Sequence, residues 1–159
     1  MTGGLEPLRD CKALRDLELY HNQLSGGLEP LRRCTALEVL YITHCSLTGS
    51  LEPLRACTAL EELYLTQNQL TGGLAPLRGC KMLEGLGLSH NLLKGSLEPL
   101  RGCVALQEFN VSNNPLQGEP LQGCTLELLQ LSDHALVPMD EDRVPTPVGE
   151  QGAASNTLS

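Results

Sequence analysis

The chain has 159 residues and a formal net charge of −8, with 41% hydrophobic residues but only 3% aromatic ones. Such an acidic chain lacks the basic footprint that a nucleic-acid backbone requires, and no apolar run approaches the roughly 20 residues of a membrane-spanning helix. We therefore expect neither a nucleic-acid nor a membrane partner. The opening residues Met-Thr-Gly-Gly-Leu contain no basic or apolar region, so no signal peptide is expected.

A unit of 23 residues that begins Leu-Glu-Pro-Leu-Arg, or Leu-Ala-Pro-Leu-Arg at Leu74, recurs along the chain. A shortened sixth unit follows five complete ones, whose first leucines are Leu5, Leu28, Leu51, Leu74 and Leu97. A constant period of this length predicts a solenoid in which each unit packs only on its neighbours. We expect the solenoid to span residues 1–136 in about six repeats. Residues 137–159 break the period and are rich in Pro, Gly, Ser and acids, which is typical of a disordered tail.

Each unit starts with a segment that cannot be a central strand, because its proline has no backbone N–H to donate. The Leu-Glu-Pro-Leu-Arg stretch is also too short for a stable α-helix, so we expect a 3₁₀-helical or irregular turn. Further along, Leu63 and Leu65 alternate with Glu62 and Tyr64, a period of two that predicts a short strand with its leucines inward. Equivalent strands of successive units are expected to lie side by side in parallel.

An asparagine follows the predicted strand in most units. If it faces inward, its amide can bond to backbone groups that the bend leaves unpaired. This structural asparagine ladder comprises Asn22, Asn68, Asn91 and Asn114. Cys45 and His134 occupy the same slot in the two other units, and the histidine suggests that the last unit is a degenerate cap.

The pattern L-x-x-L-x-L-x-x-N-x-L, repeated over about residues 5–136, resembles the leucine-rich repeat family. The stretch LTGSLEP at Leu47–Pro53 is similar to the plant-receptor subclass, whose repeats carry L-x-G-x-I-P and a short second strand, although here Glu52 precedes the proline. The resemblance implies an α/β-type solenoid with short parallel strands on its concave face and 3₁₀ or irregular turns on its convex face. It also implies that the concave face binds other macromolecules, most often proteins.

Six of the seven cysteines share one slot of the repeat, and Cys45 stands apart. The column comprises Cys11, Cys34, Cys57, Cys80, Cys103 and Cys124. Coils about 4.8 Å apart would permit disulfides, but stacked equivalent side chains point the same way rather than toward one another. Zinc is disfavoured because no C-x₂-C pair is present. We expect buried free thiols and hence a cytoplasmic protein, or an extracellular one if the chain is a fragment of a receptor.

The outward strand positions carry the candidate binding residues. All three tyrosines, three of the four histidines and five acids fall there, whereas no lysine or arginine does. We predict that a neutral or basic protein or peptide binds this face, because exposed tyrosine is a good interface residue and the acids have no balancing charge. Tyrosine stacking that only stabilises the sheet is the alternative. The predicted contact residues are Asp16, Glu18, Tyr20, His21, Tyr41, Thr43, His44, Glu62, Tyr64, Gln67, Gly85, Gly87, His90, Glu108, Asn110 and Asn113.

Two features of this face have a narrower interpretation. Gly85 and Gly87 weaken a strand and could mark the close approach of a ligand backbone, with drift as an equal explanation. His21 and His44 occupy adjacent steps of one column, but a third metal ligand is not evident, so we predict neither a metal site nor a cofactor. The histidine pair could instead make binding depend on pH.

The opposite face carries rows of glutamate and arginine three residues apart, as in Glu52 and Arg55. Stacked like charges repel, and an adjacent row of opposite sign offsets that repulsion. We interpret the rows as solvated ladders whose individual pairs contribute little. An anion-binding arginine stripe is the alternative.

No catalytic constellation is evident, so we do not expect an enzyme. His44 and Cys45 are neighbours, but one faces outward and the other inward, which separates a nucleophile from its base. The leading hypothesis is a protein-binding module that uses the concave face; a recognition fragment of a larger receptor and a passive spacer are the alternatives. The leucines of the first coil would face water, which predicts self-association through that end.

Overall fold

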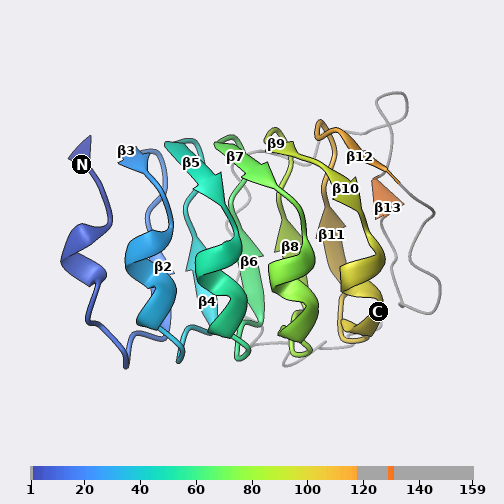
Figure 1. The fold of residues 1–159 in the computed structure, drawn as a ribbon, viewed down its shortest axis with the longest axis horizontal. Helices are drawn as coiled ribbons and strands as arrows, with labels where there is room; N and C mark the ends of the chain where they lie inside the picture. The colour runs from blue at the N-terminus through green and yellow to red at the C-terminus, as the bar shows by residue number, and fades with distance from the viewer. Residues whose placement is uncertain (1, 118–128, 131–159) are drawn as a thin grey trace, which may run out of the picture.

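The computed structural model describes residues 2–117 and 129–130. The predicted tail at 137–159, Cys124, Asp133, His134 and most of the sixth repeat lie outside the described residues. Within them, the repeats stack in one row from the blue N-terminal coil to the orange strands (Figure 1). Each complete coil has a 3₁₀ helix on one side and a short strand on the other.

Short 3₁₀ helices form the convex side of the solenoid. They are η1 (Glu6–Leu8), η2 (Glu29–Arg33), η3 (Glu52–Ala56), η4 (Ala75–Gly79) and η5 (Glu98–Gly102). Each has a proline in its first turn, where a missing N–H costs nothing because first-turn donors have no partner within the helix. The predicted 3₁₀ segments are therefore confirmed. No helix in the described part of the chain is long and apolar enough to span a membrane.

A parallel sheet forms the opposite, concave side. Its order is β13-β11-β8-β6-β4-β2. The strands are β2 (Asp16–Glu18), β4 (Val39–Tyr41), β6 (Glu62–Tyr64), β8 (Gly85–Gly87), β11 (Glu108–Asn110) and β13 (Leu129–Gln130). The register advances by one repeat per strand, so Tyr41 pairs with Tyr64, and Tyr64 pairs with Gly87. We call the outward side of this sheet the strand face.

A second set of strands runs along one edge of the stack, at the top of Figure 1. One parallel sheet comprises β1 (Thr2–Gly3), β3 (Gln23–Gly26), β5 (Ser46–Ser50), β7 (Gln69–Gly72) and β9 (Leu92–Leu93), and a separate pair comprises β10 (Gly95–Ser96) and β12 (Leu116–Gln117). Gly49 and Gly72 have φ of +84° and +85°, a backbone conformation that glycine adopts readily and other residues rarely do. The short second strand that the plant-receptor resemblance implies is present.

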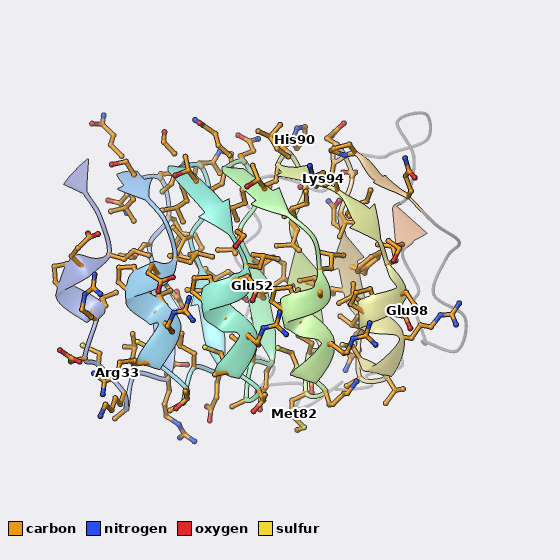
Figure 2. The ribbon with its side chains drawn as sticks, in the orientation of Figure 1. Arg33, Glu52, Met82, His90, Lys94 and Glu98 are labelled. Carbon is orange, nitrogen blue, oxygen red and sulfur yellow. The ribbon has the colours of Figure 1, made fainter. Side chains whose placement is uncertain are left out.

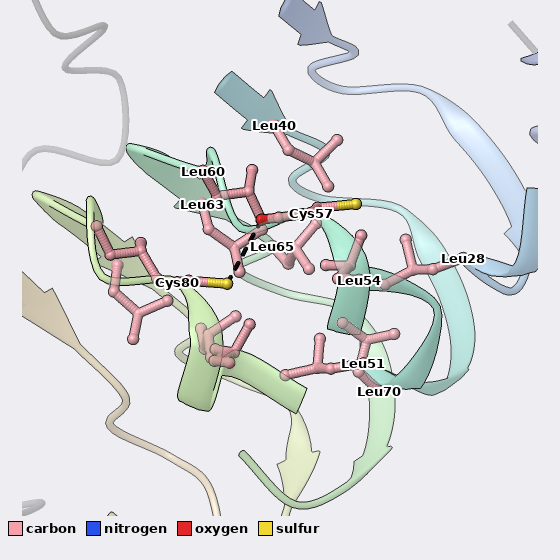
Figure 3. Close-up of a cluster of buried hydrophobic side chains, with 14 of the residues drawn as sticks. Leu28, Leu40, Leu51, Leu54, Cys57, Leu60, Leu63, Leu65, Leu70 and Cys80 are labelled. Atoms are coloured by element: carbon pink, nitrogen blue, oxygen red, sulfur yellow. Dashed lines mark hydrogen bonds between the residues drawn. The ribbon is translucent and has the colours of Figure 1, made fainter. Parts of the chain in front are cut away.

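Leucines fill the interior between the two sides. Leu40, Leu63 and Leu86 are equivalent residues of β4, β6 and β8, and each is completely buried. Figure 3 shows how leucines from the strand side, such as Leu63, meet leucines from the helix side, such as Leu54. Because every coil offers the same space, one residue type can fill the whole core.

The cysteine column lines the same interior. Cys34, Cys57, Cys80 and Cys103 are buried, and with Cys11 and Cys45 they are free thiols. The Cys80 Sγ donates to the Cys57 carbonyl of the preceding coil at 3.5 Å (Figure 3). Burial raises the pKa of the Cys57 thiol to about 11 and that of Cys80 to about 12. These thiols therefore stay neutral and act as small apolar groups that also donate weakly.

The inward asparagines join neighbouring coils. The Asn68 side chain accepts a hydrogen bond from the Leu47 backbone N–H at 3.0 Å. It also donates to the carbonyls of Ile42 and Leu65, at 2.8 and 3.1 Å. Asn91 and Asn114 make the equivalent contacts one and two coils later. Each amide thus satisfies backbone groups in two coils, as a buried bend requires.

Cys45 stands in this ladder without an acceptor oxygen. Its Sγ donates to the Asn22 carbonyl at 3.2 Å and to the Thr43 carbonyl at 3.4 Å. Asn22, in the first coil, donates to the Tyr20 carbonyl at 2.8 Å. Cysteine therefore still donates, but to carbonyls other than the equivalents of Ile42 and Leu65, and it supplies no acceptor oxygen.

Candidate functional site

The strand face presents its side chains in columns that cross the sheet. The register aligns Asp16, Val39, Glu62, Gly85 and Glu108 in the first column, and Glu18, Tyr41, Tyr64, Gly87 and Asn110 in the second. Because side chains of one strand alternate between faces, both columns point away from the leucine core. Residues that are 23 apart in sequence are therefore neighbours across the sheet.

The three tyrosines form a continuous stack over the first strands. The Tyr20 and Tyr41 rings are tilted by 46° with centroids 5.7 Å apart. The Tyr41 and Tyr64 rings are nearly parallel, at 9° and 4.8 Å. Tyr41, in the middle, is only 4% exposed although it lies on the outward side. The expectation that Tyr41 offers an exposed surface to a partner is therefore wrong, because its two neighbours cover it.

Tyr64 lies across the glycines of β8. A Cβ atom on Gly85 would be 2.5 Å from the Tyr64 hydroxyl, and one on Gly87 would be 2.5 Å from Tyr64 Cδ1. Both glycines are buried as a result. The expectation that they mark the approach of a ligand backbone is corrected, since the chain's own tyrosine occupies that space.

The hydroxyls of Tyr20 and Tyr64 form hydrogen bonds to carboxylates. Tyr64 donates to Glu108 Oε2 at 2.7 Å, two strands away, and Tyr20 donates to Glu18 Oε2 at 3.2 Å. Burial, followed by the adjoining carboxylates, raises the pKa of Tyr20 to about 12 and raises that of Tyr64 well above its usual range. Both hydroxyls therefore remain protonated donors at any physiological pH. The Tyr41 hydroxyl is buried and has no hydrogen-bond partner among the described residues.

Carboxylates dominate the charge of the strand face. Burial raises the pKa of Glu62, and the charges of Glu108, Glu84 and Glu18 raise it further. Within residues 2–117, the two strand columns contain no lysine or arginine. At the rim of the face, Arg15 forms an ion pair with Glu38 at 2.6 Å. The face therefore carries a negative potential that favours a cationic ligand.

Rim acids were missing from the predicted site. Glu38, Glu61 and Glu84 recur at the repeat period immediately before β4, β6 and β8. Their equivalents in the first and fifth coils are Arg15 and Gln107. These acids recur with the same 23-residue period as the strand columns, one residue before the first column.

The last outward column lies in the turns and has an unusual backbone. His21, His44, Gln67, His90 and Asn113 all have positive φ, between +47° and +54°. Non-glycine residues seldom adopt this conformation, so the position is strained in every coil. The His21 and His44 rings stack at 4.7 Å, and Asn113 Nδ2 lies 3.0 Å from His90 Nε2. Over the described residues, no group of three or more His, Cys, Asp or Glu side chains is arranged to hold a metal ion.

The remaining predicted contact residues have local roles. Asn110 accepts hydrogen bonds from the Ser112 backbone N–H at 3.1 Å and from the Ser112 hydroxyl at 2.8 Å. Thr43 and Gln67 are half-buried on the outward side. Asp16, Glu18 and Glu108 are exposed and flank the tyrosine stack. The accessible part of the predicted site is thus its acids, Tyr20, Tyr64 and the turn column.

On the convex side, by contrast, the glutamates of η2, η3 and η5 are paired with arginines. Arg55 bonds to both carboxylate oxygens of Glu52, at 2.7 and 2.9 Å. In η4 the glutamate position is Ala75, so Arg78 reaches Glu98 of the next coil at 2.8 Å. Figure 2 shows Glu52 and Glu98 on this helix side of the stack. The pairs lower the pKa of Glu29 and Glu52, mainly through the arginine hydrogen bonds.

Comparison with known proteins agrees with the repeat pattern. Residues 35–79 match the family described as Leucine Rich repeats (2 copies). The chain is a leucine-rich repeat solenoid. The leucine-rich repeat chain has no significant match among curated proteins. Its structural neighbours include ectodomains of plant receptors, and its short second sheet fits the plant-receptor-like subclass.

Several solved leucine-rich repeat structures are similar to this one. The ectodomain of the plant membrane receptor kinase GASSHO1/SCHENGEN3 from Arabidopsis thaliana, in complex with CASPARIAN STRIP INTEGRITY FACTOR 2, is 29% identical with a TM-score of 0.68, over 72% of this chain and 14% of that one. The plant peptide hormone receptor RGFR1, in complex with RGF2, is 28% identical with a TM-score of 0.67, over 72% of this chain and 19% of that one.

A bacterial protein shares the fold. Internalin C2 from Listeria monocytogenes has a TM-score of 0.71 at 23% identity, over 80% of this chain and 56% of that one. At this identity the likeness concerns the fold alone. The leucine-rich repeat chain thus spans less than two thirds of each of these proteins.

Proposed function

We propose that the chain is a non-catalytic module that binds a protein or peptide through its strand face. The carrying observation is the contrast between the two sides of the solenoid. Glu29, Glu52 and Glu98 on the convex side are paired with arginines, whereas the acids beside the tyrosine stack have no cation within the described strand columns. Aromatic side chains are enriched in protein interfaces. A negative charge that the chain itself does not balance favours a partner of complementary charge.

The structural neighbours support a protein or peptide partner. One receptor ectodomain was solved with CASPARIAN STRIP INTEGRITY FACTOR 2, and another is a plant peptide hormone receptor bound to RGF2. By analogy, this chain presents a similar face to a partner that is neutral to basic. The likeness to receptor ectodomains also supports the alternative that the chain is the recognition part of a larger extracellular receptor. It gives no support to a cytoplasmic setting.

We also propose that the chain does not catalyse a reaction. His44 points outward from a turn with φ of +53°, while the Cys45 Sγ donates to carbonyls on the inner side. A nucleophile and its base need hydrogen-bond contact, which this arrangement does not provide. An open sheet surface also does little to exclude water from a reaction.

Affinity capture with matched variants tests this proposal. Val39→Arg with Thr43→Arg places two bulky side chains on the strand face, and Ala56→Arg with Ala75→Arg places two on the convex side. We expect partners captured by the wild-type chain to be lost with the first variant and kept with the second. Both variants must first give the circular dichroism spectrum and thermal midpoint of the wild type. Partners kept by the strand-face variant and lost by the convex variant would overturn the proposal.

A further inference from the structure

Two carboxylates face each other across a glycine on the strand face. Glu62, Gly85 and Glu108 are register partners on β6, β8 and β11. Neighbouring strands are about 4.8 Å apart, so the two glutamates flank a gap roughly 10 Å wide at the backbone. The Tyr64 hydroxyl lies above Gly85 and forms the floor of this gap. It also donates to Glu108 Oε2 at 2.7 Å, which leaves the other Glu108 oxygen available.

The charge in this gap is unbalanced. Neither glutamate forms a salt bridge within the described residues, and both lie on columns without a basic residue. The charge of Glu108 is the largest electrostatic contribution that raises the pKa of Glu62, after burial. Glu52 behaves oppositely, because Arg55 bonds to it and lowers its pKa. Glu52 therefore has an arginine partner, whereas Glu62 and Glu108 have none within the described residues.

A buried hydroxyl lies in the same stack. Tyr41 is in register with Tyr64, and the two rings are parallel within 9° at 4.8 Å. Tyr41 cannot lie flat across β6 as Tyr64 lies across β8, because Glu62 and Tyr64 carry side chains where β8 has glycines. Its hydroxyl is buried and has no partner among the described residues. Because this hydroxyl is covered, an incoming group contacts Tyr64 rather than Tyr41.

The gap and its unbalanced negative charge select one kind of group. A guanidinium has five donors in one plane, so it can bond to two carboxylates at once and still lie against a tyrosine ring. An ammonium is a compact point charge that does not match two acceptors at opposite ends of a gap. A metal ion needs three or more ligands, and the described residues offer no such group here.

We propose that the partner inserts an arginine side chain above Gly85, between the carboxylates of Glu62 and Glu108 and against Tyr64. This inference rests on the proposed function, and it specifies the chemistry of the partner: a peptide segment with an accessible arginine. The acids nearby, Glu18 and Glu84, add to the potential that attracts it.

Selection from a displayed library of random decapeptides provides the probe. The library is panned on the immobilised wild-type chain, and arginine is expected to be enriched over its input frequency in the binders. The best binder is then synthesised with arginine, with lysine, or with citrulline, which keeps the shape of arginine but not its charge. We expect citrulline to weaken binding by tenfold or more in fluorescence polarisation, and lysine to be intermediate.

Matched variants locate the arginine. Glu62→Gln with Glu108→Gln removes two acids from the gap, and Glu29→Gln with Glu52→Gln removes two from the convex side. The difference between the arginine and citrulline peptides should vanish in the first variant and persist in the second. Glu108→Arg, which places a guanidinium in the gap, should also abolish binding of the arginine peptide. All variants must retain the circular dichroism spectrum of the wild type.

Three results would overturn the inference. They are binders without arginine enrichment, a citrulline effect that survives Glu62→Gln with Glu108→Gln, and equal affinity for the lysine and arginine peptides. Failure to select any binder would also overturn it. If Val39→Arg with Thr43→Arg abolishes peptide binding while citrulline has no effect, the strand face stands as the binding surface and only the arginine assignment fails. If neither strand-face variant changes peptide binding, the proposed function fails with it.

Discussion

Gly85 and Gly87 allow Tyr64 to lie flat across β8, because any side chain there would overlap the ring. Glycine in a strand normally costs roughly 0.5–1 kcal/mol relative to alanine. Here that cost is offset by the packing of the half-buried ring on the glycines and by the hydrogen bond to Glu108. The glycines therefore belong to the tyrosine stack rather than to an empty patch.

A double-mutant cycle measures this coupling. Gly87→Ala should destabilise the wild type, because its Cβ forces Tyr64 off β8, but should be neutral or stabilising in a Tyr64→Ser background. The expected coupling free energy is about 1–3 kcal/mol, obtained from urea unfolding of the four chains. Additive effects would show that Tyr64 does not pack on the glycines.

Position 45 is the weak point of the asparagine ladder. An asparagine there would regain an acceptor for the Leu24 backbone N–H and a donor to the Leu19 carbonyl, by analogy with Asn68. We expect Cys45→Asn to raise the free energy of unfolding by about 1 kcal/mol. Cys45→Ser, which keeps the size but cannot span both groups, is the control. A Cys45→Asn variant no more stable than Cys45→Ser would contradict the analogy.

At the scale of elements, the cysteine column is a row of neutral thiols between the helices and the sheet. Burial raises the pKa of Cys57 to about 11 and of Cys80 to about 12, whereas thiols in the unfolded chain ionise near 8.5. Because the thiol pKa values are higher in the folded chain than in the unfolded chain, the contribution of these thiols to the free energy of unfolding is fully present below the unfolded-state pKa. It is lost as pH rises through the folded-state values.

Urea unfolding at pH 7, 9 and 10.5 tests this column. We expect the free energy of unfolding to be flat up to about pH 8.5 and to fall above it. Cys57→Ala with Cys80→Ala should be less stable at pH 7, because it removes two buried side chains, but should show a shallower alkaline fall. Equal slopes would assign the fall to the tyrosines instead, whose pKa values are also raised.

At the scale of the whole molecule, the first coil is less covered than the others. Leu8, Cys11 and Leu14 are half-buried, whereas their equivalents in the second coil, Leu31, Cys34 and Leu37, are completely buried. β2 is also the last strand of its sheet, so one of its edges has no neighbouring strand among the described residues. Self-association through this end therefore remains a prediction with a physical reason, since apolar surface and a free sheet edge favour pairing.

Sedimentation equilibrium checks that prediction. The apparent mass should rise with concentration for the wild type and stay at the 17.1 kDa monomer for Leu14→Glu. Met82→Glu, on an exposed residue of the fourth coil, is the control and should associate like the wild type. A wild-type monomer at all concentrations would remove self-association.

The sequence by itself determined the solenoid, the 3₁₀ turns and the side of the sheet on which each residue lies. These features depend on local periods: two residues for the strand and 23 for the coil. Because these periods can be read from the sequence, the sequence also predicted that the tyrosines and acids lie on one face of the sheet.

Only the tertiary structure decided which of those residues are accessible. Tyr41 is covered by side chains that are 21 and 23 residues away, and Tyr64 reaches Glu108, which is 44 residues away. The direction in which a ring leans depends on the size of its neighbours across the sheet, and no period of a single strand contains that information. The same holds for the positive φ of the turn column, which the closure of each coil imposes on residues as different as His44 and Gln67.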